Sequence, residues 1–274
     1  MQVFQPVIVA ASLIVWLNIF RRWLTGRPIV PFEPRLSVSW IGSDVFLLIV
    51  ALPVFDSIAI GLSRSQVAQP AGEISASVLA AITGARLLWI AFAIVYLEKR
   101  TAARPVDIGF DTSHIRDDAR LGFLAFLAAA LPVYGTVFVV SQLFPQTEHQ
   151  LARLVREQPG GGLLGLAALS AIIVAPLAEE LLFRVILQGW FERQMEMLRE
   201  RRGNAFAKAS RALPILASSA AFAVMHEGYD RIALFVLALF LGFLYQQTHR
   251  IYPSLILHAC VNALAVIGLS LGEG

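Results

Sequence analysis

Two adjacent glutamates and an arginine stand inside an otherwise apolar stretch of the sequence. Residues 160–178 carry no charge, Glu179, Glu180 and Arg184 follow, and the next three residues are apolar again. One charge at the centre of a bilayer helix costs about 3 kcal/mol on insertion scales, so such residues are usually paired or face a wet cavity. On an α-helix Glu180 and Arg184 share a face, whereas Glu179 points about 100° away. We therefore expect a Glu180–Arg184 ion pair and a Glu179 without a cation of its own.

An acidic side chain without a cation, placed in a low-dielectric cavity that holds water, is a candidate general base. The alternative is that the glutamates and the arginine only brace a transporter or a scaffold. This cluster alone does not separate the two interpretations.

Two further polar pairs follow at helical spacing. Phe222 and His226 are four residues apart, as are His258 and Asn262. A lone histidine at a helix end is more often a capping or interfacial residue than a functional one. His258 and Asn262 share a helix face and both can donate hydrogen bonds, which suits donors aimed at a developing oxyanion. The alternative is a hydrogen bond between helices, and it is stronger for Asn262 than for His258.

The depths of these residues in a membrane can be compared through the helical rise. At 1.5 Å per residue, Glu179 lies roughly 15 Å and His258 roughly 10 Å from the cytoplasmic side, so the two can meet. His226 comes out deeper, at roughly 20 Å, and fits least well. Tilt, or an inward dip of residues 227–229 along a wet cavity, would bring it nearer.

The composition predicts the elements that carry these residues. Of 274 residues, 57% are hydrophobic and 15% are charged, against about 25% charged in an ordinary soluble domain. The apolar residues form long blocks, which indicates one all-α domain over residues 1–274, a polytopic membrane helix bundle. No basic, aromatic-interleaved patch indicates nucleic-acid binding. We expect about eight transmembrane helices, over residues 1–20, 40–62, 78–97, 121–144, 163–190, 212–226, 232–247 and 252–271.

Charges outside and inside the spans predict topology and one more ion pair. Lys and Arg cluster after the first, third and fifth spans, which places these loops in the cytoplasm and both termini outside. The first span lacks a positive n-region and a cleavage site, so we expect it to be retained. Asp56 and Arg86 fall at similar depths on neighbouring spans, and we expect a structural ion pair rather than a catalytic one. Cys260, the single cysteine, is expected to pack rather than to attack a substrate.

Taken in order, the three motifs resemble the CAAX protease and bacteriocin-processing (CPBP) family of intramembrane endopeptidases, relatives of the Ras-converting CAAX endopeptidase. The resemblance covers residues 175–265 and includes residues 241–245 and 253–258, whereas the first four spans match only as hydrophobic helices. The charged segment 191–211 departs from the family pattern and is expected to alter the cytoplasmic entrance.

The resemblance implies hydrolysis of a peptide bond inside the membrane. Glu179 and His226 would activate a water, and His258 and Asn262 would stabilise the tetrahedral oxyanion. Glu180 and Arg184 would hold the shape of the site as structural support.

We expect no metal and no other cofactor. A zinc-dependent CAAX-type metalloprotease is the nearest alternative, because one glutamate and two histidines are plausible ligands, although the sequence has no His-Glu-x-x-His helix. A non-proteolytic membrane scaffold or transporter is the alternative from another class. The expected partners are the lipid bilayer of the cell membrane, which the chain crosses several times, and a membrane protein or peptide substrate, prenylated substrates included. The motifs leave the identity of the substrate open.

Overall fold

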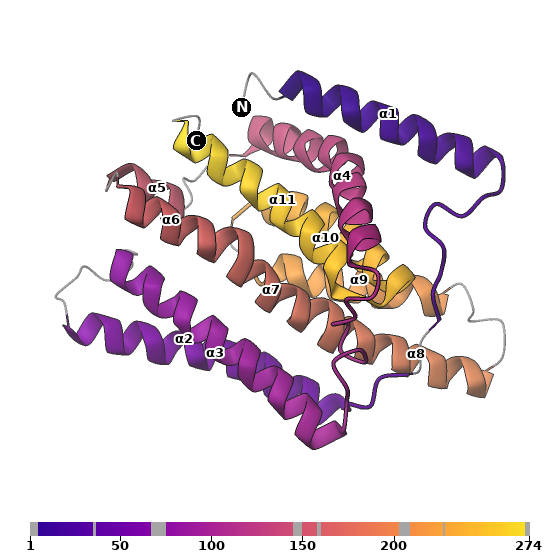
Figure 1. The fold of residues 1–274 in the computed structure, drawn as a ribbon, viewed down its shortest axis with the longest axis horizontal. Coiled ribbons are helices and arrows are strands. Elements are labelled where there is room, and N and C mark those ends of the chain that lie inside the picture. The colour runs from indigo at the N-terminus through magenta and orange to yellow at the C-terminus, as the bar shows by residue number, and fades with distance from the viewer. Residues whose placement is uncertain are drawn as a thin grey trace.

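The computed structural model describes residues 5–34, 37–66, 75–144, 150–157, 160–202, 209–226 and 228–271. Every regular element in these ranges is a helix (Figure 1), as the all-α prediction requires. The helices are α1 (Gln5–Leu24), α2 (Gly42–Gln66), α3 (Ala76–Thr101), α4 (Ile115–Leu143), α5 (Gln150–Glu157), α6 (Gly161–Ala168), η1 (Leu169–Val174), α7 (Ala175–Glu180), η2 (Leu181–Gln188), α8 (Gly189–Arg202), α9 (Ala209–Val224), α10 (Arg231–Thr248) and α11 (Ile251–Ser270).

Seven helices in the described part of the chain are long and apolar enough to cross a membrane. They are α1, α2, α3, α4, the continuous helix over Gly161–Arg201, α10 and α11. The sixth expected span corresponds to α9, which is apolar but shorter, over Arg211–Val224. The polytopic helix bundle is therefore confirmed, and the chain is a multi-pass membrane protein.

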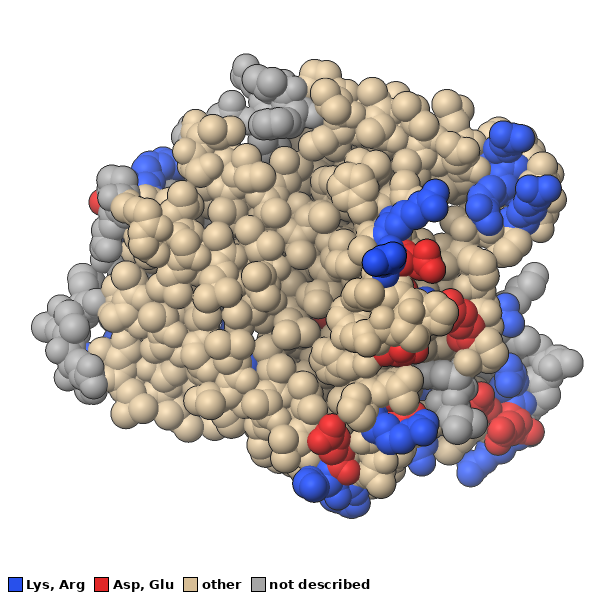
Figure 2. All heavy atoms as spheres, viewed as in Figure 1, with Lys and Arg blue, Asp and Glu red and all other residues tan. Residues whose placement is uncertain are grey.

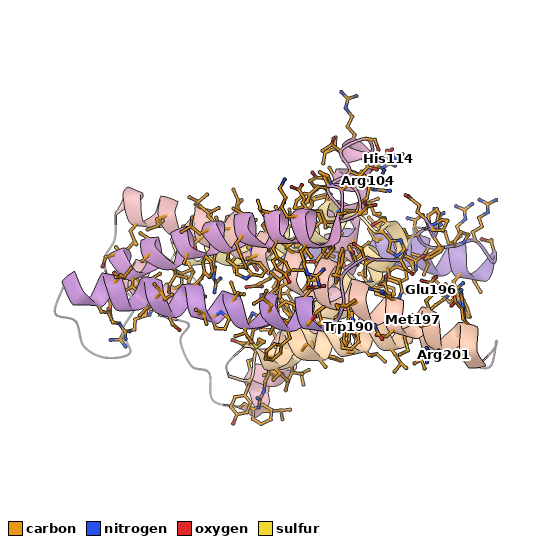
Figure 3. The ribbon with its side chains drawn as sticks, turned by 90° about the horizontal axis from the view of Figure 1, so that it is seen from below. Arg104, His114, Trp190, Glu196, Met197 and Arg201 are labelled. Atoms are coloured by element: carbon orange, nitrogen blue, oxygen red, sulfur yellow. The ribbon has the colours of Figure 1, made fainter. Side chains whose placement is uncertain are left out.

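The fifth expected span is the first part of a much longer helix. Elements α6, η1, α7, η2 and α8 follow one another without a break. The 41 residues of this helix measure roughly 60 Å at 1.5 Å per residue, about twice the hydrocarbon thickness of a bilayer. Part of the segment expected as a charged insert, residues 191–202, is therefore a helical extension, and Glu196, Met197 and Arg201 lie toward its projecting end (Figure 3).

The basic helix ends follow the predicted arrangement of the loops. Helices α1, α3 and α8 run in the same direction across the molecule, so their C-terminal ends face the same side (Figure 1). Arg21 and Arg22 end α1, and Lys99 and Arg100 end α3. Figure 2 shows that the charged side chains of this face gather mainly toward that side, beside a broad uncharged surface. The placement of this side in the cytoplasm stays a prediction.

Helix α11, which carries His258 and Asn262, is fixed by close packing against α4. A Cβ atom at Gly122 of α4 would stand 2.7 Å from the carbonyl oxygen of Pro253 and 2.8 Å from Cβ of Ile256. Small residues allow such approaches between membrane helices, where lipid is as apolar as the helix surfaces. Around this crossing α4, α10 and α11 share an apolar cluster that includes Phe126, Leu241 and Leu257.

A proline in α4 leaves a backbone carbonyl that a neighbouring helix satisfies. Pro132 has no N–H for the carbonyl oxygen of Ala128, its acceptor in a regular α-helix. The indole N–H of Trp16 in α1 donates to that oxygen at 3.0 Å. Prolines are tolerated in membrane helices when side chains of other helices satisfy the freed backbone groups in this way.

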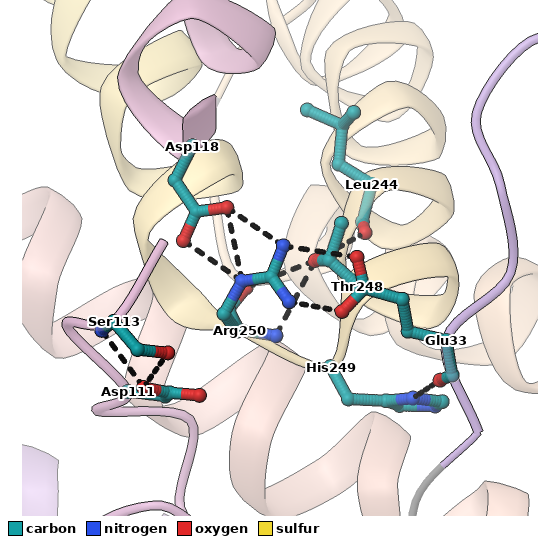
Figure 4. A network of polar contacts seen from close by, with 8 residues as sticks. All are labelled: Glu33, Asp111, Ser113, Asp118, Leu244, Thr248, His249 and Arg250. Carbon is teal, nitrogen blue, oxygen red and sulfur yellow. Dashed lines mark hydrogen bonds and ion pairs between the residues drawn. The ribbon is translucent and has the colours of Figure 1, made fainter. Parts of the chain in front are cut away.

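A buried arginine joins three segments where α10 passes into α11 (Figure 4). Arg250 Nε lies 2.9 Å from both carboxylate oxygens of Asp118 at the start of α4, and its Nη atoms donate to Glu33. Burial lowers the pKa of the Arg250 guanidinium, but the hydrogen bonds to Asp118 and Glu33 outweigh burial and raise that pKa above its ordinary value. Nearby, the hydroxyl and N–H of Ser113 donate to Asp111 and hold the pKa of that carboxyl below its usual range. The network fixes the ends of α4, α10 and α11 relative to one another.

Candidate active site

Glu180 is a fully buried carboxylate held between a cation and an imidazole. Its Oε2 lies 3.3 Å from Arg184 Nε, so the ion pair expected from their spacing is present. Its Oε1 lies 3.0 Å from Nδ1 of His258, which is also buried. Burying a charge is costly unless it is paired and hydrogen-bonded, and Glu180 meets both conditions. The side chain is 0% exposed, so its contacts orient Arg184 and His258 and leave it no access to a substrate.

Arg184 extends this cluster to α9 and α10. Its Nη1 donates to the hydroxyl of Ser218 at 3.2 Å, and that hydroxyl donates to Oε1 of Gln188 at 3.0 Å. The amide of Gln188 donates to the carbonyl oxygen of Gly242 at 2.9 Å. The sequence reading missed Ser218 and Gln188. The sequence signal for each of them was weak: a polar side chain inside a helix that is otherwise largely apolar.

Glu179 differs from Glu180 in exposure and in partners. Its side chain is 19% exposed, its Oε2 lies 3.7 Å from Nε2 of His258, and its Oε1 lies 4.0 Å from Nη1 of Arg86 in α3. The expectation that Glu179 has no cation was therefore wrong. The expected pair of Asp56 and Arg86 forms, with 3.5 Å between Oδ2 and Nε, and the same guanidinium also faces Glu179.

His258 lies between the two glutamates. Nδ1 faces Glu180 and Nε2 faces Glu179. The 3.0 Å contact is a hydrogen bond, whereas 3.7 Å is longer than a direct one. The hydrogen bond to Glu180 therefore holds the ring, and the separation between Nε2 and Glu179 is the larger of the two.

His226 is held in one tautomer by its own helix. Its Nδ1 lies 2.7 Å from the carbonyl oxygen of Phe222. A carbonyl only accepts, so Nδ1 carries the hydrogen and Nε2 of the neutral ring is left as an acceptor. The Phe222 ring contacts the rings of both His226 and His258, with centroids 4.6 and 5.8 Å apart. One phenylalanine ring therefore contacts both histidines despite their different predicted depths.

Asn262 makes the contact between helices that was the alternative to an oxyanion role. Its Nδ2 donates to the carbonyl oxygen of Ala171 in η1 at 2.7 Å. The N–H of Ala175 bonds five residues back, to Ser170. The next donor in that pattern would be residue 176, which is a proline without an N–H. Asn262 supplies the missing donor, and the amide has a second N–H that this bond does not use.

The helix that carries both glutamates is not a regular α-helix. The π-helical segments η1 and η2 flank α7, and such segments are frequent at functional sites. In η2 the carbonyl oxygen of Ile186 accepts from the buried indole of Trp40 at 2.9 Å. Sequence periodicity does not predict these segments, because the apolar residues run on every face.

The donor set does not fit a zinc ion in this arrangement. In the part of the chain that the structure describes, no group of three or more His, Cys, Asp or Glu side chains is placed to hold a metal ion. Both nitrogens of His258 face carboxylates, and Glu180 is engaged by Arg184.

Fold and site together define a polytopic helical membrane protein with a buried glutamate–histidine cluster drawn from three helices. Residues 162–264, which contain all three motifs, match a family model described as type II CAAX prenyl endopeptidase Rce1-like. Over this segment the chain is thus similar to the CAAX protease (CPBP) family, whose members are membrane-embedded proteases that act on protein substrates. No curated protein and no solved structure matches the chain.

Proposed function

We propose that this protein is an intramembrane endopeptidase of the glutamic type, in which Glu179 is the general base. One observation carries the assignment: of two adjacent glutamates, Glu180 is sealed from solvent by Arg184 and His258, whereas Glu179 is 19% exposed. A base must reach the proton that it abstracts, and Glu179 alone of the pair meets that condition.

The proposed reaction begins with a water molecule held by the Glu179 carboxylate and Nε2 of His226. The tautomer of His226 supports this role, because its Nδ1 is committed to Phe222 and its Nε2 is left as an acceptor. Glu179 takes one proton as the water oxygen attacks the peptide carbonyl carbon. The same proton is then delivered to the leaving nitrogen as the C–N bond breaks, so that one carboxylic acid and one amine are formed.

His258 and Asn262 are proposed to stabilise the oxyanion. The cluster holds the carboxylates of Asp56, Glu179 and Glu180 against the guanidinium groups of Arg86 and Arg184. His258 would contribute an N–H of its imidazole as one donor. Asn262 would contribute its second N–H, since its first is used by Ala171. Preorganised donors of this kind stabilise charge that develops in the transition state.

We propose a membrane-anchored polypeptide as the substrate and a cell membrane as the location. A prenylated peptide with a CAAX terminus is the first substrate to test, because the matched family model is that of a CAAX prenyl endopeptidase. An unprenylated membrane peptide of the same sequence is the second.

The test is cleavage of a fluorogenic farnesylated CAAX peptide by the full-length protein in proteoliposomes. We expect Glu179→Gln to abolish cleavage, and Glu157→Gln, which alters an exposed i,i+4 pair with Arg153 on α5, to leave it unchanged. Cleavage that persists in Glu179→Gln would refute the mechanism. Comparing peptide termini in membranes that contain wild-type or Glu179→Ala protein would then identify natural substrates.

Two alternatives predict different results in the same assay. A zinc metalloprotease would lose activity in a chelator and regain it with zinc, whereas the glutamic mechanism is indifferent to both. A scaffold or transporter would cleave no peptide, and its cellular phenotype would survive Glu179→Gln.

A further inference from the structure

Arg86 is a charged residue near the middle of a membrane-spanning helix, outside the segment that matches the family model. It belongs to α3, and the match covers residues 162–264. Its side chain is 27% exposed and lies between two carboxylates, at 3.5 Å from Asp56 of α2 and 4.0 Å from Glu179 of α7. An intramembrane arginine is expensive and usually has a partner or a function. One carboxylate would have been enough to pair it.

The geometry separates the two partners. Asp56 is the nearer and faces Nε, whereas Glu179 is the farther and faces Nη1. Arginine can bind one carboxylate with two parallel hydrogen bonds, and such a pair would occupy both oxygens of the base. Here only Oε1 of Glu179 faces Arg86, and Oε2 faces His258.

From these contacts we infer that Arg86 is a positioning residue for Glu179, and that Asp56 holds Arg86 at the required distance. The guanidinium contact holds the Glu179 carboxylate turned so that Oε2 points to His258. Asp56 takes the closer contact, which prevents Arg86 from closing on Glu179 and neutralising the base. The inference rests on the proposed function, and it assigns to α2 and α3 a part in catalysis that the matched domain does not contain.

A merely structural Asp56–Arg86 brace makes a different prediction. Its loss would lower stability and leave the turnover of the folded fraction unchanged. Loss of a positioning residue lowers kcat of folded protein with little change in KM, because the contact matters to the reacting geometry rather than to substrate binding.

The experiment measures kcat and KM for Arg86→Gln, Arg86→Lys and Asp56→Asn in proteoliposomes with the farnesylated peptide. We expect Arg86→Gln to lower kcat by about 10- to 100-fold, the range that misplacement of a reacting group produces. Arg86→Lys should recover part of the loss, because it restores the charge but not the shape of the fork. Guanidinium ion added to Arg86→Ala should also raise its kcat, and an equal concentration of sodium chloride should not.

Arg100→Ala is the matched control. It removes the same charge from the same helix, at its exposed end about 21 Å away by helical rise. We expect wild-type kcat and KM from this variant. A wild-type kcat in Arg86→Gln would overturn the inference, and so would an Arg86→Lys no better than Arg86→Gln. Should Arg86→Gln fail to fold, a lower kcat in both folded Arg86→Lys and Asp56→Asn supports the inference, and a wild-type kcat in both overturns it.

A readout independent of cleavage separates this inference from the proposed function. If Arg86 interacts with Glu179, the shift of the thermal midpoint caused by Arg86→Gln will differ between the wild-type and Glu179→Gln backgrounds. Additive shifts would overturn the contact even in an active enzyme. Conversely, a coupled pair in a protein that cleaves no peptide would refute the proposed function and leave the contact standing.

Discussion

The amide of Asn262 donates to the carbonyl oxygen of Ala171 at 2.7 Å, an oxygen that the π-helical backbone leaves without a donor because Pro176, five residues later, has no N–H. One N–H of the Asn262 amide thus has a structural role, and the other N–H is the proposed oxyanion donor. The two roles can be measured apart, because the first depends on a proline that can be changed.

We expect Asn262→Ala to lower the free energy of unfolding by about 1 kcal/mol, since it leaves a half-buried carbonyl unsatisfied. Pro176→Ala restores a backbone N–H, so the double variant should recover this stability without recovering kcat. Asn18→Ala is the control, because the exposed amide of Asn18 donates to the carbonyl oxygen of Ile14 within α1. If the double variant regains full activity, the role of Asn262 is structural alone.

The two glutamates should separate stability from activity. Glu180→Gln leaves Arg184 buried without its carboxylate, and breaking a buried pair in this way costs about 3–5 kcal/mol. Glu179→Gln should cost less than about 1 kcal/mol, because Arg86 keeps Asp56 as its nearer partner. Thermal or denaturant unfolding in detergent, paired with the cleavage assay, tests both. Equal destabilisation by the two substitutions would contradict the assignment of Glu180 to support and Glu179 to chemistry.

The substitution His226→Asn keeps the hydrogen bond that Nδ1 donates to Phe222 and removes the basic nitrogen Nε2. An asparagine amide can donate to the carbonyl oxygen of Phe222 as Nδ1 does, but it has no basic group in the place of Nε2. We expect His226→Asn to fold with a wild-type thermal midpoint and to lose about 100- to 10,000-fold in kcat, the range for a general acid–base group. A His226→Asn protein with high activity would remove His226 from the proposed water-activating pair.

Most of this fold could be predicted from the sequence, because membrane-spanning helices are long and almost entirely apolar. Runs of about 20 apolar residues have few alternatives in a bilayer, and the long spans were found with small errors at their ends. The short sixth span was predicted at residues 212–226 and corresponds to α9, whereas the continuation of the fifth span into α8 was not predicted. That continuation depends on where a helix stops rather than on whether it exists, and α8 continues through charged residues that hydropathy assigns to a loop.

The site was predicted less completely, because several of its contacts join residues that are far apart in the sequence. The Glu180–Arg184 pair follows from a spacing of four, and it is present. The contact of Arg86 with Glu179 joins residues 93 positions apart across two helices, and neither spacing nor composition encodes it. The bond from Asn262 to Ala171 likewise requires knowing that the backbone changes to a π-helical pattern before Pro176. The depth of a residue along a span can be counted from the sequence. The direction that its side chain faces around the helix axis is known only once the packing of the helices is known.

The crossing of α4 and α11 provides a mechanical test of how the site is positioned. At Gly122 an added methyl group would meet the backbone oxygen of Pro253 and Cβ of Ile256, neither of which can move without moving α11. Gly122→Ala should therefore destabilise the protein by about 1–3 kcal/mol, the usual cost of overpacking. Gly135→Ala, in the same helix with open space around it, should be neutral or slightly stabilising, because alanine favours helix. Since α11 carries His258, we also expect Gly122→Ala to lower kcat in the protein that remains folded, and an unchanged kcat would mean that the histidine is held by Glu180 rather than by the helix crossing.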